Sequence, residues 1–282
     1  MRILIARYLG FCTGVNRAYK LAIKTAAKKL PVYILGYLVH NQKVIEKLES
    51  LGIKVVSSLK EVPKDEKACL IISAHGLPPK TMEELKKNSK LKVIDTTCPW
   101  VSKAQLLAKK LASDGYHVVI VGDRDHVEVK GLLGWAGKGA QVIESAKELG
   151  RIKFHKKIGV IAQTTQTEEN FEDVAKGLFE KAEELKIFNT ICEATKNRQK
   201  FATVVAKRSE IMFIIGDKKS ANTRRLAKLC EQTGVKTYQV ESADDIDLNW
   251  LKGFDMIGVT AGASTPSWLI NDAIKKLKGQ SL

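Results

Sequence analysis

The sequence predicts an α/β fold of three pseudo-threefold-related units with mostly parallel sheets around a central cavity, a trefoil. The first observation is a repeat. Segments that begin at Cys12, Cys98 and Cys192 each run through an amphipathic helix and an apolar strand to a glycine and then a polar residue. The second is its spacing, because each glycine follows its cysteine by 24 positions, by subtraction of the residue numbers. The third is size, since 282 residues, 44% of them hydrophobic, suffice for two or three cores.

Local patterns predict the elements of the repeat. Apolar residues at helical spacing predict the helices, and short aliphatic runs that end at glycine predict the strands. In chain order the repeated elements are the helix Val15–Lys29, the strand Val32–Leu35 and His40 after Gly36; the helix Val101–Ala112, the strand His117–Val121 and His126 after Gly122; and the helix Arg198–Ser209, the strand Ile211–Ile215 and Ser220 after Gly216. Each unit is thus a parallel α/β layer of about ninety residues.

Each unit continues through a second helix to another apolar strand, which ends in small or polar residues. These strand ends are Ser73–Gly76, Ala162–Thr165 and Thr260–Ser264. Open α/β sheets bind ligands in the crevice beyond the carboxyl ends of their strands. We therefore expect three crevices to face the central cavity, where the three cysteines and a set of polar side chains converge.

The repeat also predicts the domain boundaries. We place the first unit at 13–97, the second at 98–191 and the third at 192–282. A short apolar strand within residues 1–12 precedes Cys12 in the way that Val93 and Ile94 precede Cys98. Pairing of this N-terminal strand with the third unit would close the ring.

Composition limits the classes of partner. A net charge of +16, from 47 basic and 31 acidic residues, favours anionic ligands or acidic proteins, although lysines on helix faces are more simply a solvated surface. No aromatic RNA-binding motif or arginine-rich tail is present, and the apolar runs fall far below the about 18 residues of a membrane-spanning helix. Phe11 is not the small residue that lipoprotein cleavage requires. We expect no nucleic acid, no membrane and a cytoplasmic location.

The five cysteines divide into two groups. Cys12, Cys98 and Cys192 each stand at the entry to a predicted helix, where unpaired N–H groups and the helix dipole favour a thiolate. Cys69 lies in an apolar strand and Cys230 in a helix, so they are interpreted as core residues. An odd cysteine count in a cytosolic chain argues against disulfides.

The three repeated thiolates indicate iron. They can fill three corners of one 4Fe-4S cluster and leave the fourth iron open to a substrate oxygen. Three cysteines with three imidazoles could instead bind zinc, but zinc gives no reason for cysteines spread evenly along the chain. We favour the cluster.

Polar residues at the strand ends predict an anion site. His40, His75 and His126 come from the first two units, and the third offers Ser220, Asn222 and Ser264. Together they form a set of hydrogen-bond donors suited to a diphosphate, assisted by helix N-termini. His117 and His155 are interpreted as structural. The sequence has no GxxxxGK[ST] loop, so a P-loop nucleotide site is not predicted.

These residues resemble a known family through at least seven motifs, which follow one another in order over nearly the whole chain. The motifs are Gly10–Val15, Ser73–Gly76, Asp95–Pro99, His126–Val129, Gln163–Thr165, Thr195–Gln199 and Thr260–Ser264. They are similar to those of the 4-hydroxy-3-methylbut-2-enyl diphosphate reductases, which perform the last step of the methylerythritol phosphate route to isoprenoids.

The resemblance implies an activity and a role for each site residue. It implies that Cys12, Cys98 and Cys192 ligate the cluster, and that a hydroxylated allylic diphosphate is reduced to isopentenyl and dimethylallyl diphosphates in a trefoil fold. The residues implied to bind the diphosphate are His40, His75, Ser220, Asn222 and Ser264. Those implied to surround the alcohol are His126, Thr164 and Glu128.

Two residues depart from the family pattern. Val127 stands where the family usually has proline, and this could loosen the loop that aims Glu128. Ala221 replaces a serine, so one hydroxyl is lost from the diphosphate site.

Glu128 is the single carboxylate in the strand-end set, so our hypothesis makes it the acid that protonates the leaving hydroxyl, with Thr164 as a relay. Two electrons would enter from an acidic donor such as a ferredoxin or flavodoxin. Two alternatives remain open from the residues alone: a non-catalytic iron-sulfur redox sensor, and a basic nucleic-acid-binding protein with structural thiols.

Overall fold

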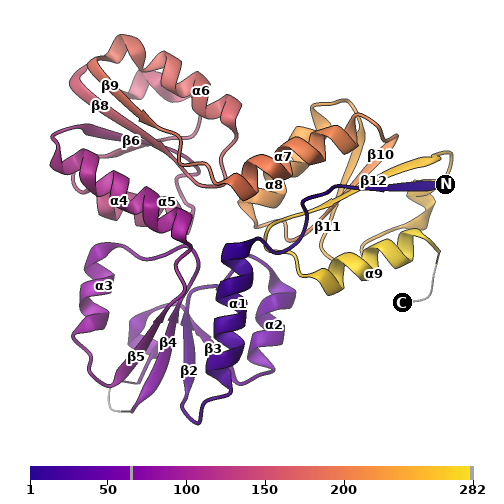
Figure 1. Ribbon diagram of the computed structural model, residues 1–282, viewed down its shortest axis with the longest axis horizontal. Helices are drawn as coiled ribbons and strands as arrows, with labels where there is room; N and C mark the ends of the chain where they lie inside the picture. Colours follow the sequence, from indigo (N-terminus) through magenta and orange to yellow (C-terminus); the bar gives the residue numbers. More distant parts are fainter. Residues whose placement is uncertain (64–65, 280–282) are drawn as a thin grey trace. The chain divides into compact units, whose positions relative to one another are not determined.

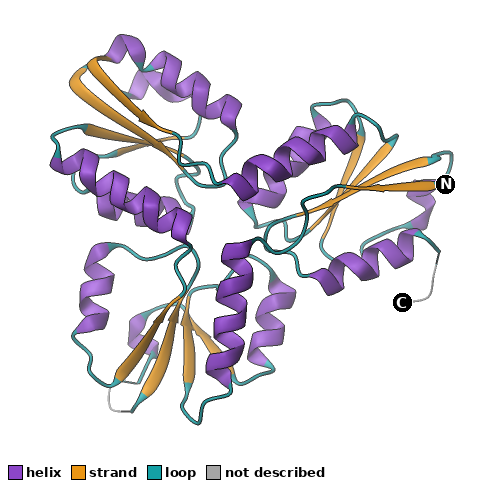
Figure 2. Cartoon of the chain, viewed as in Figure 1, coloured by secondary structure: helices purple, strands orange, loops and turns teal. Residues whose placement is uncertain are grey.

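The computed structural model describes residues 1–63 and 66–279, which fold into two compact units. The smaller unit contains Met1–Asn16, Val39–Glu46 and the chain from Glu193 onward, and the larger unit contains Arg17–Leu38 and Lys47–Cys192. The described residues form three parallel sheets of four strands each, flanked by helices (Figures 1 and 2). The three-unit α/β fold predicted from the repeat is therefore confirmed.

Two sheets belong to the larger unit and one to the smaller. The first sheet contains β2 (Val32–Leu35), β3 (Ile53–Val56), β4 (Ala68–Ile72) and β5 (Leu91–Asp95), with helices α1 (Thr13–Ala26), α2 (Gln42–Glu49) and α3 (Pro79–Lys86) in the same stretch of chain. The second contains β6 (His117–Val121), β7 (Gln141–Ile143), β8 (His155–Ala162) and β9 (Ala182–Phe188), with α4 (Pro99–Ser113), α5 (Val127–Ala136) and α6 (Glu168–Gly177). The third contains β1 (Arg2–Ile5), β10 (Ile211–Ile215), β11 (Lys236–Val240) and β12 (Met256–Ala261), with α7 (Glu193–Ala206), α8 (Ala221–Glu231) and α9 (Ser267–Leu277). Short 3-10 helices are η1 (Leu59–Glu61), η2 (Ala146–Arg151), η3 (Phe179–Lys181) and η4 (Leu248–Leu251).

One strand order is repeated in all three sheets. The orders are β5-β4-β2-β3, β9-β8-β6-β7 and β1-β12-β10-β11. In each sheet the first strand of this order is the one that leads into a cysteine, since β5 precedes Cys98, β9 precedes Cys192 and β1 precedes Cys12. Strand β1 pairs in parallel with β12, with Arg2 opposite Met256. The boundaries drawn at residues 98 and 192 stay a prediction.

Buried strands alternate their side chains between two helical layers, as a period of two requires. In the third sheet, Phe213 of β10 packs with α9 on one face, and Ile214 packs with α7 and α8 on the other. In the second sheet, Ile120 of β6 packs with α4 and α5, and Val119 packs with α6. Both faces of these strands are therefore buried, which explains why they read as continuous apolar runs.

The helices that follow the cysteines begin earlier than predicted. Helices α1, α4 and α7 begin at Thr13, Pro99 and Glu193, each directly after a cysteine. Proline at the first helical position explains the start of α4, because its fixed φ suits a helix and its missing N–H is not needed there. The strands Val32–Leu35, His117–Val121 and Ile211–Ile215 agree with the prediction.

His117 and His155, at the starts of β6 and β8, stack with ring centroids 3.8 Å apart. Burial, with a smaller contribution from the charge of His155, lowers the pKa of His117 below its usual value. The unfolded chain therefore binds this proton more readily, so stability is complete above about pH 6.5 and falls as the pH drops toward the lowered pKa. We expect His117→Gln to flatten this pH dependence. Urea unfolding at pH 7.5 and 5.5 gives the free energy of unfolding at each pH. An equal change of this free energy between the two pH values in the wild type and the variant would contradict the prediction.

No helix within residues 1–63 and 66–279 has the length and apolar character needed to cross a bilayer. All five cysteines are described, and none of them forms a disulfide bond.

Candidate active site

Each of the three repeated cysteines makes an equivalent backbone hydrogen bond. The N–H of Cys98 donates to the carbonyl of Ala74, that of Cys192 to Thr164 and that of Cys12 to Ala263. Each acceptor lies two residues beyond the end of a central strand, β4, β8 or β12. The same bond at three equivalent places holds each cysteine at the carboxyl edge of a parallel sheet.

The cysteine thiols suit a soft metal centre. All three are partly exposed and stand directly before a helix, and the Sγ of Cys12 accepts a hydrogen bond from the N–H of Val15. By contrast, burial raises the pKa of Cys230 to about 12, so that cysteine stays a neutral thiol. Iron-sulfur groups are held by cysteine thiolates, and a helix N-terminus favours the thiolate form. The residues present therefore fit such a group.

Glu128 and Thr164 form a buried pair in the larger unit. Glu128 lies in the first turn of α5 and is 2% exposed. Its Oε1 accepts from the N–H of Thr164 at 2.6 Å, and its Oε2 accepts from the hydroxyl of Thr164 at 2.8 Å. Because the carbonyl of Thr164 also accepts from the N–H of Cys192, the pair is tied directly to one of the cysteines.

Two histidines continue this arrangement toward Cys98. His126 caps α5, with its Nδ1 accepting from the N–H of Glu128 at 3.2 Å. Its ring lies edge-on to that of His75, with centroids 5.4 Å apart. His75 follows Ala74, whose carbonyl accepts from Cys98. A chain of contacts thus connects Cys98 to Cys192 through His75, His126 and Glu128, all within the larger unit.

A glycine allows His75 its position. Gly76 has a φ of 71°, which L side chains rarely adopt. A Cβ there would also lie 2.5 Å from Nε2 of Gln105, a buried side chain of α4. The glycine after His75 therefore has an explanation, since a larger residue would strain the backbone and displace the side chains of Gln105 and Thr97.

We expect Thr164→Val to lower turnover by about ten- to a hundredfold. Valine keeps the shape of threonine but removes the hydroxyl that donates to Glu128, which leaves a buried carboxylate oxygen with one partner fewer. The matched control is Thr164→Ser, which keeps the hydroxyl and should retain most activity. Steady-state kinetics of the three proteins measure this, and equal loss in both variants would show that packing, not the hydroxyl, matters.

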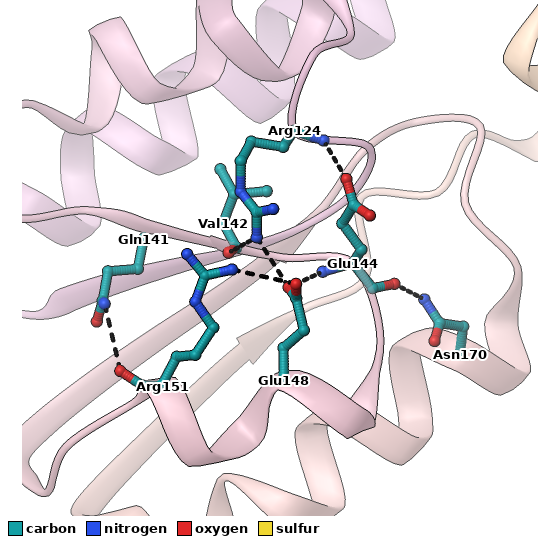
Figure 3. A network of polar contacts seen from close by, with 7 residues as sticks. All are labelled: Arg124, Gln141, Val142, Glu144, Glu148, Arg151 and Asn170. Atoms are coloured by element: carbon teal, nitrogen blue, oxygen red, sulfur yellow. Dashed lines mark hydrogen bonds and ion pairs between the residues drawn. The ribbon is translucent and has the colours of Figure 1, made fainter.

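The loop that leads to His126 is fixed from both sides. The N–H of Asp123 donates to Oε1 of the buried Gln163, the residue before Thr164. On the other side Arg124 donates through its N–H to Glu144 and through its guanidinium to Glu148 and to the carbonyl of Val142 (Figure 3). These anchors hold the loop in place although residue 127 is valine.

Glu148 is the centre of this network. It accepts hydrogen bonds from the N–H of Glu144 and from the guanidinium groups of Arg124 and Arg151 (Figure 3). The Glu144 N–H, then Arg124, hold the pKa of the Glu148 carboxyl below its usual value. Since the charged form is favoured in the folded protein, this contribution to stability is lost as the pH falls below the unfolded pKa.

We expect Arg124→Ala to lower turnover several-fold and to lower stability by about 1 kcal/mol, because the loop loses its side-chain anchor. Hydrogen exchange of residues 123–126 should become faster. Lys176→Ala is the matched control, since its ion pair with Glu172 is exposed and such pairs contribute about 0.5 kcal/mol or less. Unchanged exchange in the Arg124 variant would argue against the anchoring role.

The smaller unit gathers the other predicted anion ligands. The hydroxyl of Ser264 donates to the carbonyl of His40 at 3.0 Å and lies 3.4 Å from the hydroxyl of Ser220. Ser220 caps α8. Asp217 accepts from the N–H of Gln42, which fixes the segment that carries His40. Cys12 joins this group through the carbonyl of Ala263, the neighbour of Ser264.

Asn222 has an unmet hydrogen-bonding capacity. Asn222 is only 4% exposed. Among the described residues, neither the nitrogen nor the oxygen of its side-chain amide has a hydrogen-bond partner. Leaving such groups unpaired costs about 1–3 kcal/mol each. A polar ligand would remove that cost. Asn222 lies on α8 two residues after Ser220, so the unmet groups stand beside the helix N-terminus.

Burial and charges of both signs act on His40. Burial lowers the pKa of His40, and the nearby charges of Arg224 and Lys219 lower it further, while Asp217 acts in the opposite direction. The imidazole is therefore neutral near pH 7 in the absence of a ligand. A bound anion would offset the two cations and favour protonation.

The structure thus places every predicted site residue in one of two groups. Cys98, Cys192, His75, His126, Glu128 and Thr164 are connected by contacts in the larger unit, and Cys12, His40, Ser220, Asn222 and Ser264 lie in the smaller unit.

Sequence reasoning gave no role to several residues that position these groups. Arg198 donates to the carbonyl of Gly10, just before Cys12. Thr96 and Thr190 donate from their hydroxyls to the last carbonyls of β4 and β8. A signal was available for the threonines, because each stands two positions before a cysteine.

The chain is similar to known proteins over nearly its whole length. The family model described as LytB protein matches residues 3–278. A 4-hydroxy-3-methylbut-2-enyl diphosphate reductase of Geobacter sulfurreducens is 41% identical over 278 residues, covering 99% of this chain and 97% of the relative. An enzyme of the same name from Caldanaerobacter subterraneus subsp. tengcongensis is 42% identical over 282 residues, with coverage of 99% and 97%.

Solved structures show the same fold. A structure of (E)-4-hydroxy-3-methyl-but-2-enyl diphosphate reductase, described as the terminal enzyme of the non-mevalonate pathway, is 38% identical with a TM-score of 0.72, and the match covers 98% of this chain and 99% of that one. The corresponding reductase of Plasmodium falciparum is 28% identical with a TM-score of 0.92, covering 98% and 87%.

Proposed function

The chain belongs to the LytB family of 4-hydroxy-3-methylbut-2-enyl diphosphate reductases, and from this premise we propose how its own residues carry out the reduction. The enzyme is an iron-sulfur oxidoreductase of isoprenoid synthesis. Its reaction removes the hydroxyl of the allylic diphosphate with two electrons and two protons, releases water, and gives isopentenyl and dimethylallyl diphosphates.

Cys12, Cys98 and Cys192 are proposed to hold one 4Fe-4S cluster with one iron open to the substrate. Three observations support the set: the shared backbone hydrogen bond, the partial exposure of all three thiols, and their places before helices. When bound, the cluster supplies electrons and a Lewis-acidic site for the alcohol oxygen.

The diphosphate is proposed to bind His40, His75, Ser220, Asn222 and Ser264. The unpaired amide of Asn222 supports this role, because two buried polar atoms without protein partners indicate a polar ligand. Ala221 lacks the hydroxyl usual in the family, but its backbone N–H lies in the first turn of α8, where such groups are free to donate to an anion.

Glu128 is proposed as the proton donor to the departing hydroxyl, with Thr164 orienting it and His126 beside it. The observation that carries this role is the pair of hydrogen bonds that fix both carboxylate oxygens onto Thr164. A carboxyl held in one orientation can deliver a proton to one position, which is the requirement for general acid catalysis.

Electrons are proposed to come from an acidic redox protein such as a ferredoxin or flavodoxin, because the chain carries a net charge of +16. We place the enzyme in the cytoplasm, where free thiols persist.

An anaerobic reduction assay tests the function. Protein reconstituted with iron and sulfide should be brown and, with reduced methyl viologen, should convert 4-hydroxy-3-methylbut-2-enyl diphosphate into the two isomeric products, detected by mass spectrometry. A brown protein without turnover would favour a redox sensor. A colourless protein that binds RNA would favour the nucleic-acid alternative.

A further inference from the structure

An open groove of about 690 Å³ runs along the exposed side of α4 in the larger unit. Arg17, Lys103 and Lys110 line it, and Asp95 is the only carboxylate among its lining residues, all of which the structure describes. Asp95 is already engaged, because its Oδ1 accepts from both the N–H and the hydroxyl of Thr97. The groove is therefore positively charged.

Apolar side chains stand between these cations. Leu106 lines the groove and is 62% exposed, which is unusual for a leucine on an amphipathic helix. Trp100, six residues earlier on α4, is 37% exposed, and the Nζ of Lys103 lies 5.6 Å from its ring centroid. Leu106 lies between Lys103 and Lys110 on the helix, and Trp100 lies beside the groove. Exposed apolar side chains surrounded by charged ones match the arrangement of a protein interface, in which apolar anchors lie inside a polar rim. A nucleic acid or a small anion would use the charges but not the leucine.

The groove lies next to a proposed cluster ligand. Helix α4 begins at Pro99, the residue after Cys98, and Leu106 is about 10 Å further along the helix axis. The guanidinium of Arg17 donates to the carbonyl of Thr97 at 3.1 Å, and this fixes one cation of the groove onto the segment that leads into Cys98. Thr97 and Pro99, the two neighbours of Cys98 in the sequence, line the groove, so a protein docked here would lie close to Cys98.

The geometry points to a partner of one kind. We propose that the α4 groove, lined by Arg17, Lys103, Leu106 and Lys110, is the docking site of a small acidic electron-transfer protein. The inference rests on the proposed function, which needs two electrons per substrate. The donor is oxidised twice, one electron at a time, while the carbon–oxygen bond of the substrate is reduced with uptake of two protons and loss of water.

The test uses an oxidised bacterial flavodoxin as the binding probe and compares the reconstituted wild type with two charge-reversed proteins. Lys103→Glu/Lys110→Glu changes the groove, and Lys153→Glu/Lys156→Glu makes the same charge change at exposed lysines of the same unit outside it. At low salt we expect calorimetry to show at least about tenfold weaker binding for the groove variant and less than about threefold for the control, because local complementarity and not net charge steers docking. Leu106→Ala should weaken binding several-fold even at high salt.

Turnover separates docking from chemistry. With reduced flavodoxin the groove variant should be at least about tenfold slower, and with reduced methyl viologen it should match the wild type. Equal binding by the wild type and the groove variant, or equal losses in groove variant and control, would overturn the proposal. So would a short RNA that displaces flavodoxin and loses its affinity in the groove variant. A wild type that binds flavodoxin through the groove but does not reduce the diphosphate with methyl viologen would overturn the proposed function instead.

Discussion

Replacing Cys98 or Cys192 with serine is expected to abolish the brown colour of reconstituted protein and to lower turnover by more than about a hundredfold. Outer-shell partners of metal ligands already cost about 10–100-fold when removed, so loss of a ligand itself should cost more. Serine keeps the size of the side chain, and the backbone N–H bonds to Ala74 and Thr164 do not depend on it. The fold should therefore survive, with an unchanged far-ultraviolet circular dichroism spectrum.

The chain provides its own control for this experiment. Cys230 is a buried thiol on α8 whose pKa is raised to about 12, which makes it unsuited to hold iron. Cys230→Ala should keep iron, sulfide and turnover, with at most a modest loss of stability from the cavity. Iron and sulfide analysis of the wild type, the two serine variants and Cys230→Ala measures which cysteines are needed to hold the cluster. A serine variant that retains full iron content and turnover would remove that cysteine from the proposed ligand set.

The repeat explains why so much of the fold could be predicted. A fixed distance from cysteine to glycine identifies equivalent positions, and the alternation of helix with buried apolar strand allows little besides parallel α/β units. Helix starts were predicted late because the residue directly after each cysteine is Thr13, Pro99 or Glu193, and apolar periodicity begins only further along. Capping geometry, which places the cysteine just before the helix, is not visible in that periodicity.

The positioning contacts of the site were beyond sequence reasoning for a different reason. Gln163 and Arg124 fix one loop through hydrogen bonds across 40 and 24 positions of sequence, to Asp123 and Glu148 respectively. No local pattern specifies such pairs, because side chains of this type are common on any surface. The Glu128–Thr164 pair could be named as a hypothesis, but that both carboxylate oxygens contact the same residue follows only from the three-dimensional structure.

Glu128→Gln is expected to lower turnover by about 10²–10⁴-fold, the usual contribution of a general acid, while cluster content and the KM for the diphosphate change little. The amide can replace the carboxylate without rearrangement. Its oxygen can accept from the N–H of Thr164, and its nitrogen can donate to the hydroxyl of Thr164, which then acts as the acceptor. What the variant loses is a transferable proton.

A double-mutant cycle with Thr164→Val distinguishes catalysis from packing. If Thr164 acts on the reaction by orienting the carboxyl group, its replacement should cost little more once Glu128 is already glutamine, so that the effects on turnover are strongly non-additive. Additive losses would mean that the two residues act independently. Normal turnover by Glu128→Gln would remove the acid role altogether, and the proton would then have to come from another group, with His126 next to it the nearest titratable candidate in the contacts described.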